Sequence, residues 1–267
     1  GPFTAMKIPG STAEDNVRTV DVKASVDGGL LHIVRQSTST GCEKEGLAMT
    51  LASAEEMAQS WGKPYGMETY ESLLLEKKSK AEGLAKERAE KDKKDIEERF
   101  KDEVKSFHDK APVKINATRV TSFGNDNQPF TYQTDYTMDG LVKKAGRNLT
   151  ISVGQLIGQQ KHLEGKERKR TEDVYYDYPS SYKVNLDLEV PSGYSVSAES
   201  LQKLNTLIDN AAIRFEVNAE QAKGKVIVHV QKVYKKQIVP VAEWAQLLEA
   251  LDRAYAFTNQ QVILKKN

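Results

Sequence analysis

The sequence predicts a mainly β fold with helical elements: antiparallel, β-sandwich-like sheets plus one long charged helix and a short C-terminal helix. Three observations support this prediction. Short segments alternate apolar and polar residues and are separated by glycine, proline or asparagine. One long, strongly charged segment repeats its apolar residues at helical spacing. A shorter segment with the same spacing opens at Pro240, a residue type favoured in the first turn of a helix.

The first predicted elements are the two strands of a hairpin. Residues 16–27 are rich in valine, and residues 30–34 are apolar around one histidine. Between them, Asp27, Gly28 and Gly29 tolerate the positive φ angles that a tight turn requires. The turn and its β-branched flanks therefore indicate the same structure.

Helix formers dominate the next part of the chain. Residues 53–110 contain few β-branched residues, and Gly62 and Pro64 interrupt them, so we expect two helices. The longer helix is predicted to be continuous over residues 68–108. Its first half offers mainly alanines to a partner, whereas its second half carries large side chains such as Phe100. Sustained leucine heptads are missing, so we expect this helix to pack on its own sheet rather than in a coiled coil.

A period of two returns after residue 111 and predicts further strands. The clearest is residues 182–190, whose odd and even positions are polar and apolar in turn. Residues 198–210 also fit a helix by the spacing of their leucines and stay ambiguous. The predicted strands are residues 113–123, 130–138, 148–157, 182–190, 211–219, 225–233 and 261–265.

These elements suggest a division of the chain into three ranges. Residues 1–12 are interpreted as a cloning scar and linker. Residues 13–195 are predicted to form a β-rich domain with a helical insertion at about 53–110. Residues 196–267 are predicted to form a C-terminal β/α subdomain packed on the first domain or continuous with it.

Composition argues against several classes of protein. The chain has 267 residues, and 39 Lys plus Arg against 38 Asp plus Glu give a formal charge of +1, so no global field favours nucleic acid. No apolar run approaches the roughly 20 residues that span a bilayer, so we expect no transmembrane segment. Cys42 is the single cysteine, which excludes an internal disulfide and a multi-cysteine zinc site.

Three stretches resemble one family of proteins. The first is Asp15-Asn16-Val17-Arg18-Thr19-Val20 followed by Val26-Asp27-Gly28-Gly29-Leu30. The second runs from Arg168-Lys169-Arg170-Thr171-Glu172-Asp173-Val174 through residues 182–190 to Pro191-Ser192-Gly193-Tyr194. The third comprises residues 226–233, Ile238-Val239-Pro240 and Val262-Ile263-Leu264-Lys265-Lys266. In order and spacing, the chain resembles the C-terminal β-rich region, a domain of unknown function, of bacterial transglutaminase-like multidomain proteins.

The resemblance implies a parent protein with an N-terminal β-rich domain, a papain-like transglutaminase core and this C-terminal region. Such parents are exported by Gram-negative bacteria, which implies a periplasmic or outer-membrane-associated location. The catalytic residues of the core would lie upstream of this chain. The partners implied are that core or an envelope protein or glycan. The long charged helix departs from the shorter helix expected in the family.

The residues themselves show no assembled catalytic motif. Cys42 could act as a nucleophile only beside an imidazole, and His32 is the nearest in sequence. The histidines lack metal-ligand spacing, and residues 158–166 fail the phosphate-loop pattern. We therefore predict no catalytic, cofactor-binding or metal-binding residue, and no cofactor.

One surface cluster is a candidate binding site. Basic residues precede a run of tyrosines, a combination that suits a sugar or an acidic polymer. A solvated loop that leads into an edge strand is the interpretation we favour. The candidate residues are Arg168, Lys169, Arg170, Tyr175, Tyr176 and Tyr178.

The expected function is a non-catalytic accessory or interaction module. The alternatives are a carbohydrate- or polymer-binding module that uses exposed tyrosines, and an enzyme that uses Cys42. The first alternative requires coplanar tyrosines in a groove, and the second requires a histidine or carboxylate within hydrogen-bond reach of the sulfur.

Overall fold

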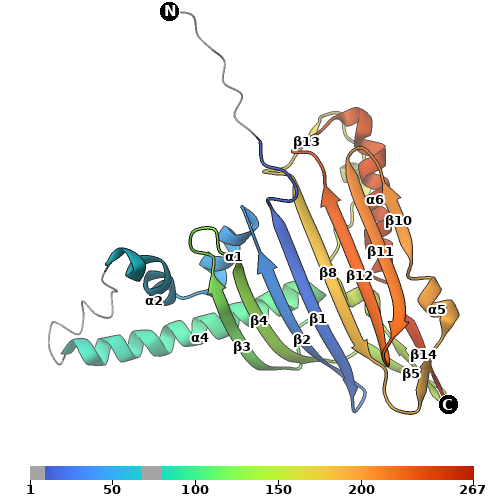
Figure 1. The fold of residues 1–267 in the computed structure, drawn as a ribbon, viewed down its shortest axis with the longest axis horizontal. Helices are drawn as coiled ribbons and strands as arrows, with labels where there is room; N and C mark the ends of the chain where they lie inside the picture. Colours follow the sequence, from blue (N-terminus) through green and yellow to red (C-terminus); the bar gives the residue numbers. More distant parts are fainter. Residues whose placement is uncertain (1–9, 68–79) are drawn as a thin grey trace, which may run out of the picture.

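A computed structural model describes residues 10–67 and 80–267 and shows one large sheet at the centre of the molecule. Helices α4 and α6 lie behind this sheet in Figure 1. In spatial order its eight strands are β10 (Thr206–Asp209), β11 (Ile213–Ala222), β12 (Lys225–Tyr234), β8 (Ser180–Glu189), β1 (Val17–Asp27), β2 (Leu30–Ser39), β4 (Phe130–Met138) and β3 (Lys114–Phe123).

The large sheet is mixed because one of its pairs is parallel. β1 and β8 run in the same direction, with Val20 opposite Val184, and every other neighbouring pair is antiparallel. Strands that are far apart in the chain can pair in parallel, because the intervening segments supply the crossover. β8 also pairs with β12, so strands from both predicted ranges, 13–195 and 196–267, share one sheet.

Two smaller sheets complete the β structure. A four-stranded sheet has the order β5 (Val142–Ala145), β6 (Asn148–Ile151), β14 (Val262–Lys266) and β9 (Tyr194–Val196). A two-stranded sheet joins β13 (Ile238–Val239) to β7 (Val174–Tyr175). The C-terminal strand β14 is therefore internal to its sheet.

The α-helices are α1 (Glu43–Leu51), α2 (Ala54–Met57), α4 (Lys80–His108), α5 (Ala198–Gln202) and α6 (Trp244–Phe257). A π-helical turn at Ala58–Gly62 and a 3₁₀ turn at Lys63–Tyr65 follow α2, and further 3₁₀ turns are Val153–Leu156, Gly165–Arg168 and Val241–Glu243. No helix in the described ranges is both long and apolar enough to cross a bilayer.

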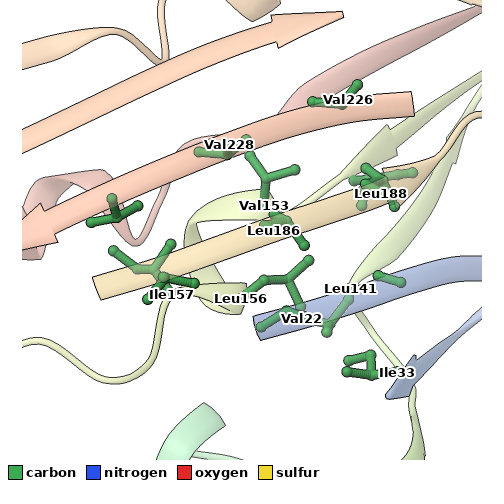
Figure 2. Close-up of a cluster of buried hydrophobic side chains, with 14 of the residues drawn as sticks. Val22, Ile33, Leu141, Val153, Leu156, Ile157, Leu186, Leu188, Val226 and Val228 are labelled. Atoms are coloured by element: carbon green, nitrogen blue, oxygen red, sulfur yellow. The ribbon is translucent and has the colours of Figure 1, made fainter. Parts of the chain in front are cut away.

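The core lies on one side of the large sheet, which we call the inner face. Residues that alternate along each strand, such as Val22, Ile33 and Leu186, point toward this side and are buried. Figure 2 shows how the segment with Val153, Leu156 and Ile157 crosses these strands. The opposite side, the outer face, carries the intervening polar residues. The side of each strand that carries the apolar residues therefore determines which face of the sheet is covered. The labelled core residues in Figure 2 are Val22, Ile33, Leu141, Val153, Leu156, Ile157, Leu186, Leu188, Val226 and Val228.

Helix α4 packs on the inner face through its C-terminal half. Phe100, Val104 and Phe107 are buried there, whereas residues 87–91 are exposed. In Figure 1 the first half of α4 extends past the edge strand β3. The expectation that large side chains such as Phe100 anchor the second half is confirmed. The predicted start of this helix, residues 68–79, lies outside the described residues, as do residues 1–9 of the predicted linker.

The predicted fold class is confirmed, with specific differences in the elements. The predicted strand 148–157 ends at Ile151, and a 3₁₀ turn follows, because Val153 and Leu156 both enter the core. The ambiguous residues 198–210 form a short helix and then strand β10. The sheets are mainly antiparallel, as expected, and β1 with β8 is the one parallel pair among the described strands. Helix α1 begins ten residues before the predicted helical insertion at 53.

Candidate functional site

An ion pair is buried between the large sheet and helix α4. The side chain of Arg35 on β2 has no exposed surface, and that of Glu103 on α4 is 11% exposed. Arg35 Nη1 donates to Glu103 Oε1 at 3.0 Å, and Nη2 donates to Oε2 of the same carboxylate. The guanidinium carbon also lies 4.0 Å from the centre of the Phe107 ring. Planar, two-point contact of this kind favours arginine over lysine.

Two further side chains complete this network. The Tyr132 hydroxyl donates to Glu103 Oε1 at 2.6 Å, and Arg18 Nη2 donates to the Tyr132 oxygen at 3.0 Å. Arg18 Nη2 also lies 3.5 Å from Glu103 Oε1. Burial would raise the pKa of Glu103, but the charge and hydrogen bonds of Arg35 outweigh this and lower it. Glu103 is therefore ionised at neutral pH and serves as the shared acceptor.

His108, at the end of α4, is a buried neutral imidazole. Its Nδ1 lies 3.0 Å from the Gln155 carbonyl oxygen, and its Nε2 lies 2.7 Å from the Tyr136 hydroxyl. A carbonyl only accepts, so Nδ1 carries the proton and Nε2 accepts from Tyr136. Burial, reinforced by the charge of Arg35, lowers the pKa of His108 to about 3.

We expect His108 to destabilise the protein as the pH falls. Its folded pKa is below the ordinary 6.5, so the unfolded chain binds the extra proton between pH 6.5 and about 3. The free energy of unfolding should fall by about 2 kcal/mol between pH 6.5 and 5, at about 1.4 kcal/mol per pH unit. Urea denaturation at several pH values measures this. His108→Gln keeps a donor and an acceptor and should lose the slope, whereas His229→Gln, an exposed control, should keep it.

Lys232 on β12 is a second buried charge on the inner face. Only 6% of the residue is exposed, and its Nζ donates to Gln160 Oε1 at 3.0 Å. Within the part of the chain that the structure describes, no carboxylate lies within ion-pair distance of this ammonium. Burial lowers the pKa of Lys232 to about 8.

The backbone register places Lys232 in a row with other polar side chains. Lys232 is opposite Tyr182 on β8, and Tyr182 is opposite Arg18 on β1. All three point to the inner face. The Tyr182 hydroxyl donates to the Ile157 carbonyl at 3.0 Å, and burial raises the pKa of Tyr182 to about 12. This row leads directly into the Arg35–Glu103 network.

An open groove of about 550 Å³ runs along this row. Gly158 lets the segment that forms one wall lie close to the sheet, because its φ is +85° and a Cβ there would approach the Tyr182 hydroxyl to 2.8 Å. The lining residues are Arg18, Leu47, Thr50, Arg99, Asp102, Glu103, Ser106, Phe107, Gly158, Gln159, Gln160, Tyr182, Lys232 and Tyr234. We call this the inner groove.

Removal of the buried ammonium is expected to stabilise the fold. A fall in the pKa of Lys232 from 10.5 to about 8 corresponds to a burial cost of about 3 kcal/mol. The variant also loses the hydrogen bond to Gln160, which offsets about 1 kcal/mol of the stability gained. Lys232→Met should thus raise the free energy of unfolding at pH 7 by about 2 kcal/mol in urea denaturation.

The pH dependence gives an independent check on Lys232. The folded pKa lies below the unfolded one, so wild-type stability should rise between pH 8 and 10.5 as the folded chain sheds its proton first. Lys232→Met should lack this rise. Lys183→Met, on the outer face, is the matched control and should behave like the wild type. A destabilised Lys232→Met would contradict the assigned burial cost.

The three basic candidate residues have different surroundings in the structure. Arg168 makes a two-point ion pair with Asp252 on α6, at 2.8 and 2.7 Å. The guanidinium of Arg170 lies 5.0 Å from the centre of the Trp244 ring, and Lys169 is exposed. The Trp244 indole N–H donates to the Arg168 carbonyl at 2.9 Å. Two of these three cations therefore fasten their loop to α6.

The three candidate tyrosines face different surroundings. Tyr175 is 71% exposed. Tyr176 is half-buried, with its ring 4.9 Å from that of Tyr234 and inclined by 49°. Tyr178 lies against Glu43 of α1. The structure thus brings Tyr176 and Arg170 to the α6 side and Tyr178 to the α1 side.

The two residues of the cysteine alternative lie at opposite ends of β2. The His32 imidazole is 2.8 Å from Asp135 on the outer face, near the β1–β2 turn. Cys42 follows the far end of the strand, which at about 3.3 Å per residue is roughly 20 Å away. Its backbone N–H donates to Asn16 Oδ1 at 3.0 Å. Among the described residues no cluster of histidine, cysteine and carboxylate has the composition of a metal site.

The outer face carries an ordered row of polar side chains across seven strands. His229 Nδ1 lies 2.9 Å from Asn185 Oδ1, and Asn185 donates to Asp21 at 2.7 Å. Arg119 donates to Gln133 at 3.1 Å. We call this the amide row; in strand order from β11 to β3 it is Asn218, His229, Asn185, Asp21, Gln36, Gln133 and Arg119. The outward positions of β1, β2, β4, β8 and β12 carry no Phe, Tyr or Trp.

Fold and sites together define a β-rich protein whose large mixed sheet is covered on one face. Residues 148–264 match the family model of a domain of unknown function, DUF3858. This range supplies Lys232, Tyr182 and Gln160 to the inner groove, whereas Arg18 and Glu103 come from the preceding part of the chain. No curated protein and no solved structure matches the chain.

Proposed function

We propose that this chain is a non-catalytic accessory module that docks its outer face onto the transglutaminase-like core of an exported bacterial protein, in the periplasm or at the outer membrane. The sequence resemblance suggests that occupant. The amide row carries the proposal, because it offers hydrogen-bonding groups across a sheet face that no element among the described residues covers. Interfaces between domains of one chain are polar in this way.

The arrangement of the amide row suits docking of a folded surface. Hydrogen bonds between some neighbours, such as Asn185 to Asp21 and Arg119 to Gln133, hold part of the row in place before binding, which lowers the entropic cost of association. Half-buried Val34 lies on the same face and adds apolar contact area. Sugar binding draws on stacking against aromatic rings, and the outward strand positions named above provide none.

The first experiment is to read the coding sequence upstream of residue 7. A transglutaminase-like core with its cysteine, histidine and aspartate is expected there. An upstream region of a different class would contradict the proposal.

The second experiment measures binding of this chain to that core by calorimetry. Gln36→Arg places a long charged side chain in the middle of the amide row and should weaken binding at least tenfold. Glu97→Arg, on the exposed side of α4, is the matched control and should bind like the wild type. Equal binding by both variants would exclude the outer face. Turnover by this chain alone, abolished in Cys42→Ser, would favour the enzyme, and glycan binding lost in Tyr175→Ala would favour the sugar-binding module.

A further inference from the structure

The inner groove contains more positive than negative charge in its buried part. Arg18 and Lys232 line the groove and Arg35 lies beside it. The nearby carboxylates are Glu103 and the half-buried Glu43 of α1, whose pKa burial raises against the opposing charge of Arg18. Both oxygens of Glu103 are already bound by Arg35. At the exposed rim, Arg99 and Asp102 balance one another in sign. Lys232 thus has no carboxylate partner among the described residues, and Arg18 shares Glu103 with Arg35 through a contact of 3.5 Å.

The donors of these two cations are incompletely used. The Lys232 ammonium has three N–H donors, and the structure gives it one acceptor, Gln160 Oε1. The Arg18 guanidinium donates through Nε to Ser37 at 3.2 Å, and through Nη2 to Tyr132 at 3.0 Å and to Glu103 at 3.5 Å. Its Nη1 has no hydrogen bond among the described residues. Both side chains line the groove.

We propose that the inner groove binds a small oxyanion, a carboxylate or a phosphate group, between Lys232 and Arg18. The two residues flank Tyr182 on three adjacent strands, so a group that lies over Tyr182 is within reach of both. Buried charge without a carboxylate partner is costly to a fold, and a chain that retains it gains something besides stability. An anion in the groove would supply the missing acceptors and offset the charge.

Supporting residues hold the two cations in place for such a ligand. Gln160 receives Lys232 through Oε1 and anchors itself by donating to the Gly158 carbonyl at 3.1 Å. The Tyr182 hydroxyl is fixed on the Ile157 carbonyl. A groove of about 550 Å³ admits a small organic acid as well as an inorganic ion. This inference is independent of the outer face and of its proposed partner.

The test is an NMR titration of the ¹⁵N-labelled 267-residue chain with acetate, citrate or inorganic phosphate, at constant ionic strength set with chloride. Saturable shifts of the amides of residues 158–160 and 232 are expected with at least one probe. Saturation by acetate and citrate assigns the site to carboxylates, and saturation by phosphate assigns it to phosphate. Shifts that fail to saturate with every probe would overturn the proposal.

Variants separate a ligand site from a general effect of anions. Lys232→Met should weaken binding at least tenfold, although the variant is expected to fold at least as stably as the wild type. Arg18→Gln should also weaken it, whereas Lys183→Met, on the same sheet but on the outer face, should bind like the wild type. Unchanged affinity in Lys232→Met would overturn the site. Failure of anion binding leaves the docking of the outer face untouched, and the reverse also holds.

Discussion

Glu103→Ala is expected to lower the free energy of unfolding by about 3–5 kcal/mol, because it leaves the fully buried Arg35 without its carboxylate. The loss combines several consequences of one missing group. Two charge-assisted hydrogen bonds from Arg35 disappear, and the Tyr132 hydroxyl loses its acceptor. Arg18 then also lies close to an unbalanced guanidinium. Urea denaturation followed by circular dichroism measures the change.

Two controls test whether the buried charge is the cause. Glu98→Ala removes a carboxylate from the same helix, but its partner Lys101 is half-exposed, so the change should stay within about 0.5 kcal/mol. The double variant Arg35→Met with Glu103→Leu replaces the pair by apolar groups and should recover most of the stability. A loss below 1 kcal/mol in Glu103→Ala would show that Arg35 has another way to be solvated.

Many strands of the large sheet could be predicted from the sequence, because alternating apolar residues indicate which side of a strand is buried. Strand β4 occupies residues 130–138 as predicted, and β12 extends the predicted 225–233 by one residue. Most inner positions there are apolar and most outer positions are polar, so the period indicates the element and its orientation. Which strands pair with one another could not be predicted in this way. That β8 lies between β1 and β12 depends on contacts between distant segments, which no local pattern encodes.

The inner groove could have been predicted in part from breaks in the same alternation. On β2 the inward positions Leu31 and Ile33 are followed by Arg35. On β12 the inward valines end at Lys232. A charged residue in the apolar phase of a strand indicates a buried charge that needs a partner. What the sequence does not provide is that both positions lie on the inner face of one sheet with β8 and β1 between them, since that follows from strand order.

The candidate binding cluster at residues 168–178 was predicted as one surface, but its side chains separate in the structure. Sequence proximity placed Arg168, Arg170 and Tyr178 in one candidate surface. The structure directs them to Asp252, to Trp244 and to helix α1, which are three different neighbours. Side chains close in sequence turn to different faces wherever a loop bends, so adjacency in an irregular segment is weak evidence for a shared site.

Removal of the C-terminal strand is expected to abolish cooperative folding. A chain that ends at Gln261 lacks β14, which pairs with β6 on one side and β9 on the other. Val262 and Leu264 are fully buried in the main core. Loss of a buried side chain of this size costs about 2–5 kcal/mol, and two of them with their backbone pairs approach the 5–15 kcal/mol of a typical domain. The shortened chain should lack a cooperative urea transition.

Neighbouring residues of β14 provide a graded version of this prediction. Leu264→Ala should cost about 2–5 kcal/mol, because the leucine side chain fills space between the two sheets. Ile263→Ala, on the opposite side of the same strand, should cost less than about 1 kcal/mol, since Ile263 is 38% exposed. The pair keeps the backbone hydrogen bonds of β14 and changes only the side-chain contacts. Equal losses at both positions would mean that the strand contributes through its backbone alone, whereas the expected asymmetry would show that the last strand of the chain completes the core.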